Sequence, residues 1–112
     1  MGDDLKWLQH WFLAHCDGEW EHGSGITIET LDNPGWHVTI NLDFTELQSA
    51  PFEPIVREAT EADWIHCRVI ERKAGPVPYG EPNFRRFEGA GGPLNLPEIL
   101  ATFRAWAERG RG

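Results

Sequence analysis

The stretch that decides the fold is ITIETLDNPGWHVTINL, residues 26–42. Residues 26–31 are rich in β-branched side chains, and residues 36–42 alternate between apolar and polar side chains. Between them, Pro34 and Gly35 fit the two central positions of a type II turn, because proline presets φ and glycine accepts a positive φ. The pattern therefore predicts a β-hairpin with one buried face and one solvated face.

Further strands are expected after this hairpin. Residues 52–58 form a weaker strand, in which Pro54 indicates an edge position or a bulge, and residues 63–71 form a stronger one. Residues 84–92, FRRFEGAGG, fit a short strand that runs into a glycine turn. Residues 73–83 contain three prolines and two glycines, which predicts a loop.

Helical periodicity marks both ends of the chain. In residues 3–16 the apolar spacing of Leu5, Leu8 and Phe12 predicts an amphipathic helix that ends at Asp17-Gly18. In residues 95–110 Asn95 suits the N-cap, and Glu98 follows three residues later, as in a capping box. The order α-β-β-β-β-α predicts an α+β fold in one domain over residues 1–112: a meandering antiparallel sheet of about four strands with both helices packed on it.

The net charge of −8 is unevenly distributed. Residues 1–63 carry 13 acidic side chains against two basic ones, whereas residues 64–112 carry eight basic against five acidic. Phosphate contacts need Lys and Arg, so we expect no direct nucleic-acid partner. No segment has the pattern of a signal peptide or a membrane span, so we also expect no membrane partner. Two cysteines without a secretory signal indicate the cytoplasm.

Several metal-binding residue types crowd one short segment, CDGEWEHG at residues 16–23, and the helix before it. The zinc spacings C-x-x-C and H-E-x-x-H are absent, so whether His15, Cys16 and His22 bind a metal stays open. Cys16 lies at a helix C-terminus and Cys67 in the middle of a strand, and neither position activates a thiol. The sequence therefore indicates no catalytic residue, no metal site and no cofactor.

Six tryptophans are many for 112 residues. Trp36 and Trp106 fit core positions. Trp64 shares a strand face with His66 and Arg68. Trp20, between two glutamates in a loop, is either an exposed anchor or a side chain folded back onto the protein, and the sequence leaves both open.

Four segments together resemble the immunity protein 53 family of bacterial polymorphic toxin systems: DLKWLQHWFLAHCDGEWEH, GITIETLDNPGWHVTINL, DWIHCRV and FEGAGGPLNLPEILATFRAW. The hallmarks are a Trp-Glu pair, Trp20-Glu21, and the triplet Pro34-Gly35-Trp36. The resemblance covers roughly residues 4–107, and the proline-rich stretch 73–83 departs from it. It implies a cytoplasmic protein, not an enzyme, that binds and blocks a cognate toxin domain.

We expect that toxin to be basic, with a nuclease as one candidate, because the chain is acidic. Alternatives are a small metal-dependent or hydrolytic enzyme using His15, Glu19, Glu21 and His22, and a small-molecule binding module. The oligomeric state stays open. The residues expected to bind the partner, as an acidic patch with tryptophan anchors, are Asp17, Glu19, Trp20, Glu21, Asp32, Trp64 and Glu88. Those expected to shape the fold are Pro34, Gly35, Trp36, Gly89, Gly91 and Gly92, with the last three in a tight connection that needs positive φ.

Overall fold

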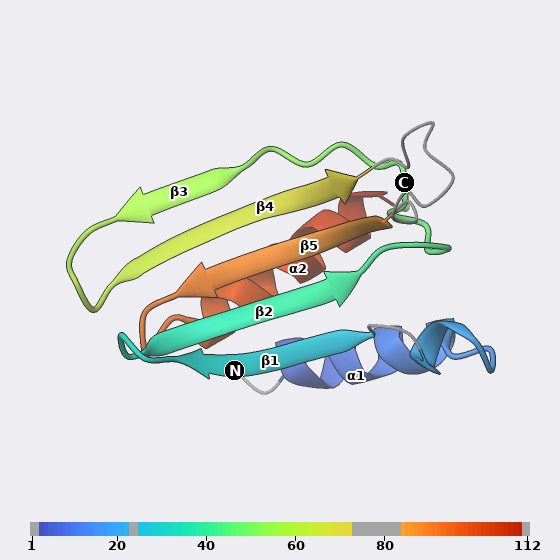
Figure 1. Cartoon of the computed structure of the whole chain (residues 1–112), viewed down its shortest axis with the longest axis horizontal. Helices are drawn as coiled ribbons and strands as arrows, with labels where there is room; N and C mark the ends of the chain where they lie inside the picture. Colours follow the sequence, from blue (N-terminus) through green and yellow to red (C-terminus); the bar gives the residue numbers. More distant parts are fainter. Residues whose placement is uncertain (1–2, 23–24, 73–83, 111–112) are drawn as a thin grey trace, which may run out of the picture.

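The computed structural model describes residues 3–22, 25–72 and 84–110, so the loop expected at residues 73–83 lies outside it. Within the described residues, Figure 1 shows two α-helices and a five-stranded sheet. Neither helix of this part is long and apolar enough to cross a bilayer. The bounds are α1 Asp3–His15, η1 (one 3-10 turn) Trp20–His22, β1 Ile26–Leu31, β2 Gly35–Asn41, β3 Ile55–Glu58, β4 Trp64–Arg72, β5 Phe84–Gly91 and α2 Leu96–Gly110.

The predicted α+β class is confirmed, with one strand more than the expected four or so. The strands form one antiparallel sheet in the order β1-β2-β5-β4-β3. Consecutive strands are neighbours within β1–β2 and within β3–β4–β5, but β5 rather than β3 lies beside β2. The single meander is therefore wrong. The segment FRRFEGAG takes the central place because Phe87, Gly89 and Gly91, on its core-facing side, are all buried.

The hairpin of residues 26–41 is confirmed, but its turn is not the predicted one. Leu31 pairs with Gly35, so the turn consists of residues 32–34 and Gly35 already belongs to β2. The φ of Gly35 is outside the left-handed region, which excludes the type II turn. What requires glycine there is space: a Cβ on Gly35 would lie 2.4 Å from the carbonyl oxygen of Gly91 in β5.

The core lies between the sheet and the two helices. Phe87 of β5 packs against Phe103 and Trp106 of α2 with ring centroids 5.2 and 6.4 Å apart. From α1, Trp11 reaches Phe103 at 5.1 Å. The buried side of α1 consists of Leu8 and Trp11 with Trp7 beside them, whereas Leu5 is half exposed. The buried side of α1 therefore includes the tryptophans and not Leu5, which the predicted apolar stripe contained. The reason is that α1 packs against the aromatic side of α2.

The glycines before α2 also serve close packing and not positive φ. A Cβ on Gly89 would lie 2.5 Å from Cγ2 of Ile99, and one on Gly92 would lie 2.3 Å from the carbonyl oxygen of Ala62. At Gly91 the nearest atoms would be at 3.0 Å. These three glycines therefore let α2 and the β3–β4 turn approach β5, and the expected positive φ is wrong for all of them.

The start of α2 is joined to the β3–β4 turn by side chains. Asn95 precedes the helix as expected, and its amide nitrogen donates to Asp63 at 3.0 Å and to Glu98 at 3.2 Å. Arg57 of β3 donates to the same two carboxylates. Glu98 therefore bonds side chains of Asn95 and Arg57 rather than completing a capping box, and this cluster holds the β3–β4 turn in place.

Candidate partner-binding surface

No described helix covers one face of the sheet, the open face, because α1 and α2 both lie on the opposite side (Figure 1). The strand register places five open-face positions in one row across all strands. From β3 to β1 the row reads Val56, His66, Ala90, His37 and Glu29. Because Ala90 is small, the face is hollowed at the middle of this row.

Charged side chains form a connected group on this face. Glu88 of β5 accepts a hydrogen bond from Arg68 at 2.8 Å and contacts a ring nitrogen of His37 at 3.3 Å. The other ring nitrogen of His37 is 3.3 Å from Glu29. Burial alone raises the pKa of Glu88, but Arg68 and His37 outweigh it, and the pKa lies below its usual value. Glu88 is therefore an ionised, partly buried group that joins β1, β2, β4 and β5.

The hollow at Ala90 has a volume of about 330 Å³ and lies between β3 and β5, beside this charged group. Its open-face lining includes Val56, His66, Arg68, Glu88 and Ala90. His66 contacts Glu58 at 2.8 Å and packs edge-on against Trp64 with ring centroids 5.2 Å apart. The hollow thus leads along β4 toward Trp64.

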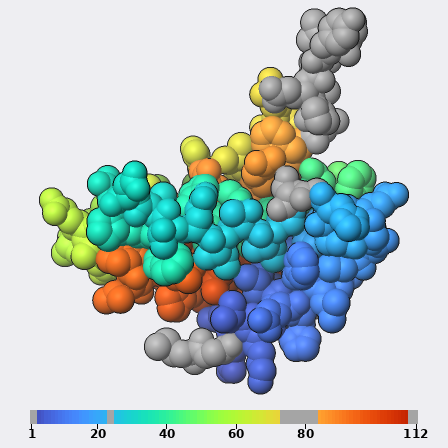
Figure 2. Space-filling model, turned by 60° about the horizontal axis from the view of Figure 1, so that its bottom comes forward, coloured from blue at the N-terminus to red at the C-terminus, as the bar shows by residue number. Residues whose placement is uncertain are grey.

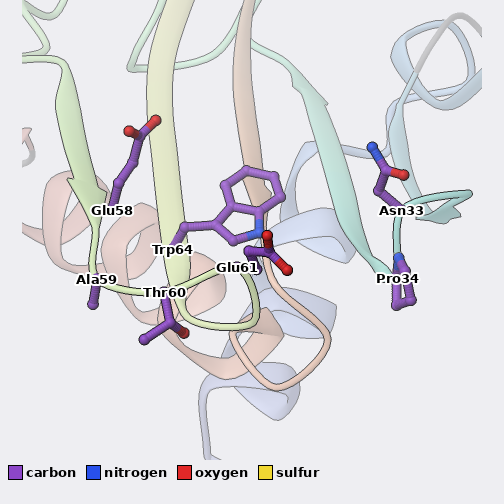
Figure 3. A pocket seen from close by; sticks show the side chains of 7 residues that line it. All are labelled: Asn33, Pro34, Glu58, Ala59, Thr60, Glu61 and Trp64. Atoms are coloured by element: carbon purple, nitrogen blue, oxygen red, sulfur yellow. The ribbon is translucent and has the colours of Figure 1, made fainter.

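Trp64 is at the centre of a larger open groove of about 760 Å³ at one end of the sheet. Figure 3 shows its indole extending from β4 toward Asn33 and Pro34 of the β1–β2 turn. Glu58, at the end of β3, lines the opposite side, and Glu61, in the β3–β4 turn, lies beside the indole in this view. The groove therefore combines a half-buried tryptophan with two exposed carboxylates.

The β3–β4 turn, which lines this groove, is held by hydrogen bonds. The backbone N–H groups of Ala59 and Thr60 both donate to the carbonyl of Asp63, at 3.0 and 3.1 Å. Hydrogen bonds from Asn95 and Arg57 hold the pKa of Asp63 below its usual value. A partner would thus meet a turn that is ordered before binding, which lowers the entropy lost on association.

Residues 16–22 of the segment CDGEWEHG form a turn that is capped by its own side chains. Asp17 accepts from the backbone N–H groups of Glu19 and Trp20, each at 2.9 Å, and Glu21 accepts from those of Asp17 and Gly18 at 2.9 and 2.8 Å. The hydrogen bonds from Trp20 and Glu19 lower the pKa of Asp17. The backbone N–H of Glu21 itself, together with those of Asp17 and Gly18, lowers the pKa of Glu21. Gly18 has the positive φ, 95°, expected after a helix. Asp17 and Glu21 are therefore committed to local structure.

Trp20 is not an exposed anchor. It is only 5% exposed, and its indole packs against Trp11, Phe12 and His15 with ring centroids 5.5–5.8 Å apart. Its Nε1 is buried without a hydrogen-bond partner among the described residues. The inward alternative is the one found, because the capped turn directs Trp20 back onto α1.

The groups proposed as metal ligands or nucleophiles have other contacts. His15 contacts the backbone carbonyl of Trp11 at 2.7 Å and Glu46 at 2.6 Å, and the Cys16 thiol donates to the carbonyl of Phe12. Burial raises the pKa of the Cys67 thiol to about 12, aided by the charge of Glu98. Across residues 3–22, 25–72 and 84–110, no three His, Cys, Asp or Glu side chains are grouped to hold a metal.

The expected acidic patch is divided between two ends of the sheet. Strand β1 separates the turn of residues 16–22 from Asp32, by about 20 Å at the usual rise per residue. Trp64 and Glu88 share the open face, and Asp32 lies in the turn that forms one side of the groove. Sequence reasoning missed Glu58 and Glu61 as their neighbours, since only the strand order brings the two hairpin turns together.

Comparison with known proteins adds the family. The model of immunity protein 53 matches residues 5–108, nearly the whole chain. The chain belongs to the immunity protein 53 family. No curated protein and no solved structure matches it significantly. Membership in an immunity protein family implies, in general terms, a toxin-neutralising role and a toxin as partner.

In this member of the immunity protein 53 family, both sequence hallmarks have structural functions. Trp20-Glu21 contributes a buried ring and a capping carboxylate to one turn. In Pro34-Gly35-Trp36, Gly35 permits close contact with β5, and the Trp36 indole donates to the carbonyl of Pro93 at 3.0 Å. Of the hallmark residues, Pro34 lines the groove, whereas the charged and aromatic groups of the open face and the groove lie outside the hallmarks.

Proposed function

We propose that this protein neutralises its cognate toxin by non-covalent binding, and that the groove around Trp64 is where the toxin docks. The observation that carries the proposal is the groove itself: a half-buried tryptophan between two ordered turns, flanked by Glu58 and Glu61. Tryptophan in a partly desolvated site is the residue type most enriched in interface hot spots. Flanking carboxylates favour a basic partner surface.

The two carboxylates differ in their availability. Glu58 is engaged with His66 on the open face. Glu61 is exposed and makes no hydrogen bond or ion pair to any residue in the described part of the chain. Glu61 can therefore pair with an incoming Lys or Arg without first breaking an internal contact, while Trp64 contributes the apolar contact.

The hollow beside the groove extends the proposed surface toward Glu88. Arg68 is the most exposed member of the group there, with 64% of its side chain accessible, and Glu88 holds its guanidinium. Acidic and basic groups side by side discriminate between partners more than they add affinity. We therefore assign affinity to the groove and partner selection to the Arg68–Glu88 pair.

The protein would act by occupying the toxin and not by catalysis, and it would do so in the cytoplasm of the cell that makes it. A basic toxin, such as a nuclease, fits the acidic groove best, since its own substrate-binding surface must carry positive charge. The acidic groups of the groove would then compete for that surface.

The test uses immobilised protein and lysate from the source organism, with retained proteins identified by mass spectrometry. We expect a toxin-like domain to be retained stoichiometrically by the wild type. Trp64→Ala and Glu61→Lys should each reduce its retention at least about tenfold, in line with hot-spot residues. Glu61 is exposed and the half-buried Trp64 lies outside the hydrophobic core, so the fold should persist, as circular dichroism would show.

Glu19→Lys is the matched control, because it makes the same charge change in the turn of residues 16–22, at the far end of β1. Retention by this variant should equal that of the wild type. Loss of retention with Glu19→Lys but not with Glu61→Lys would place the toxin at the α1 end and refute the groove.

A further inference from the structure

The two edges of the sheet differ in how well they are protected. At one edge, β3 is only four residues long, follows Pro54 and carries Arg57 and Glu58, which are features that discourage pairing with another chain. At the other edge, β1 is six residues long, pairs with β2 without a bulge, contains neither lysine nor proline and carries one charged side chain, Glu29. Strand β1 is thus the less protected edge.

The hydrogen-bond pattern shows which groups β1 offers. The N–H of Asn41 donates to the carbonyl of Gly25 at 2.8 Å, which makes these two residues a hydrogen-bonded pair. Pairs alternate along an antiparallel ladder, so Thr27 and Glu29 also bond to β2. Ile26, Ile28 and Thr30 therefore direct their N–H and C=O groups outward, and the described structure shows no hydrogen bond for these groups.

Figure 2 views the molecule toward this edge. The cyan atoms of β1 lie in front, between the open face above and the helices below, and no described element covers them. The side chains agree with this view, since the four central residues of β1 are exposed, and Ile28, on the helix side, is 37% exposed.

From this edge we propose that β1 pairs antiparallel with β1 of a second copy, about a two-fold axis at Ile28. In this register every outward-facing residue meets an outward-facing residue: Ile28 meets Ile28, and Ile26 meets Thr30. All outward backbone groups are then bonded. The two sheets join into one continuous sheet, with an Ile28–Ile28 contact on the helix side.

Charge selects this register over its neighbours. With the axis at Ile28, Glu29 of one copy lies opposite Thr27 of the other on the open face. An axis at Glu29 would place two glutamates opposite each other, and like charges in that position destabilise a strand pair. An axis at Thr27 would leave Thr30 beyond the end of the paired strand. The second copy is thus the occupant that this edge fits.

The dimer should be weak and reversible. Pairing of one six-residue strand buries less surface than a standard interface, so we expect a dissociation constant of about 10–100 µM. Each copy carries a net charge of −8, and this repulsion is screened by salt. Dimerisation should therefore strengthen as the salt concentration rises.

Sedimentation velocity over a range of protein concentrations tests the proposal with the purified chain alone. The wild type should shift from 12.8 kDa toward twice that mass. Thr27→Lys should tighten the dimer about threefold to tenfold by facing Glu29 of the other copy, and Thr27→Glu should weaken it by a similar factor. Ile28→Pro removes one outward N–H without breaking the bonds to β2, and should give a monomer.

Val56→Lys and Val56→Glu make the same charge changes on the open face at the other edge, β3, and should leave the dissociation constant unchanged. A wild type that remains monomeric at about 1 mM would refute the dimer. So would a dimer that responds to the Val56 variants and not to the Thr27 variants. Neither result depends on a toxin, so the groove proposal stands or falls separately.

Discussion

Gly35 lies directly against the backbone of Gly91, so that a Cβ on Gly35 would come within 2.4 Å of the Gly91 carbonyl oxygen. The contact joins β2 to the central strand β5 next to the groove. We expect Gly35→Ala to lower the free energy of unfolding by about 2 kcal/mol, because one backbone segment must move. Urea denaturation followed by tryptophan fluorescence measures this.

Substitution by Asn distinguishes the two reasons for which a position can require glycine, steric crowding and a positive φ. Asn tolerates positive φ better than Ala, so it rescues sites where φ is the constraint. At Gly18, with a φ of 95° and no atom within 4 Å, Gly18→Asn should be clearly less harmful than Gly18→Ala. At Gly35 the larger Asn should be no better than Ala. Rescue by Asn at Gly35 would contradict the crowding argument.

Phe44 combines two unfavourable features: its φ is 64° and its side chain is 85% exposed. A bulky residue in the left-handed region is strained by about 1–2 kcal/mol, and little burial offsets the strain. We expect Phe44→Gly to raise the free energy of unfolding by up to about 1 kcal/mol after the entropy of glycine is subtracted. Thermal denaturation measures the difference.

Leu94→Gly is the control for Phe44→Gly. Leu94 is 88% exposed and its φ is not in the left-handed region, so glycine should be neutral or destabilising there. Equal stabilisation at both positions would show that removal of exposed apolar surface, and not relief of φ, is responsible.

Glu46 joins α1 to the loop after β2, because it accepts from the Trp11 indole at 2.9 Å and contacts His15 at 2.6 Å. Burial raises the pKa of Glu46, but hydrogen bonds from its own backbone N–H, Trp11 and His15 outweigh this and bring it below its usual 4.5. The folded state therefore favours the ionised form. The resulting stability is present above the usual pKa and is lost as the pH falls through the folded value.

Glu46→Gln removes this contribution. We expect the variant to be less stable than the wild type at pH 7, and the difference in stability to shrink as the pH falls below the usual pKa of 4.5. Denaturant titrations at several pH values measure it. Glu53→Gln, at an exposed site without a hydrogen bond in the described structure, should show no such difference. A stability difference between Glu46→Gln and the wild type that stays constant as the pH falls below 4.5 would exclude the ionised Glu46 carboxylate as its source.

Asn95 is 8% exposed, and its amide nitrogen is the donor to two carboxylates, those of Asp63 and Glu98. Asn95→Ala should lower the free energy of unfolding by about 1–2 kcal/mol through the lost bonds. At pH 7, Asn95→Asp should lower the free energy of unfolding by about 2 kcal/mol more than Asn95→Ala does, because three carboxylates would then lie together. Asn33→Asp makes the same chemical change in an exposed turn and should be within about 0.5 kcal/mol of neutral. If Asn95→Asp were no worse than Asn95→Ala, the convergence of charges at this turn would be disproved.

Local features of the fold were predictable from the sequence. The alternation in residues 36–42 correctly places Val38 and Ile40 in the core and His37 on the open face. The helix ends at Gly18 and Asn95 are also confirmed, within a residue or two. These features depend on side chains within a few positions of one another, and periodicity and turn chemistry report such contacts directly.

The candidate site was predictable only in part. The open-face position of Trp64 follows from strand alternation, which places it on the same side of β4 as His66 and Arg68. The inward position of Trp20 did not follow, because a loop tryptophan between glutamates has no periodicity to indicate its direction. Nor did the pairing of Glu58 and Glu61 with the β1–β2 turn, which depends on residues about 25 positions away along the chain.

The sequence by itself determined the helices, the hairpin, the alternation of each strand and, through its resemblance over most of its length, the immunity protein 53 family. Only the tertiary structure decided that β5 is central, that Trp20 is buried, that Trp64 lies in an acidic groove and that β1 is an open edge. The physical reason is the range of the interactions. Secondary structure reflects neighbours along the chain, whereas strand order, grooves and edges arise where α2 and the two hairpins pack together.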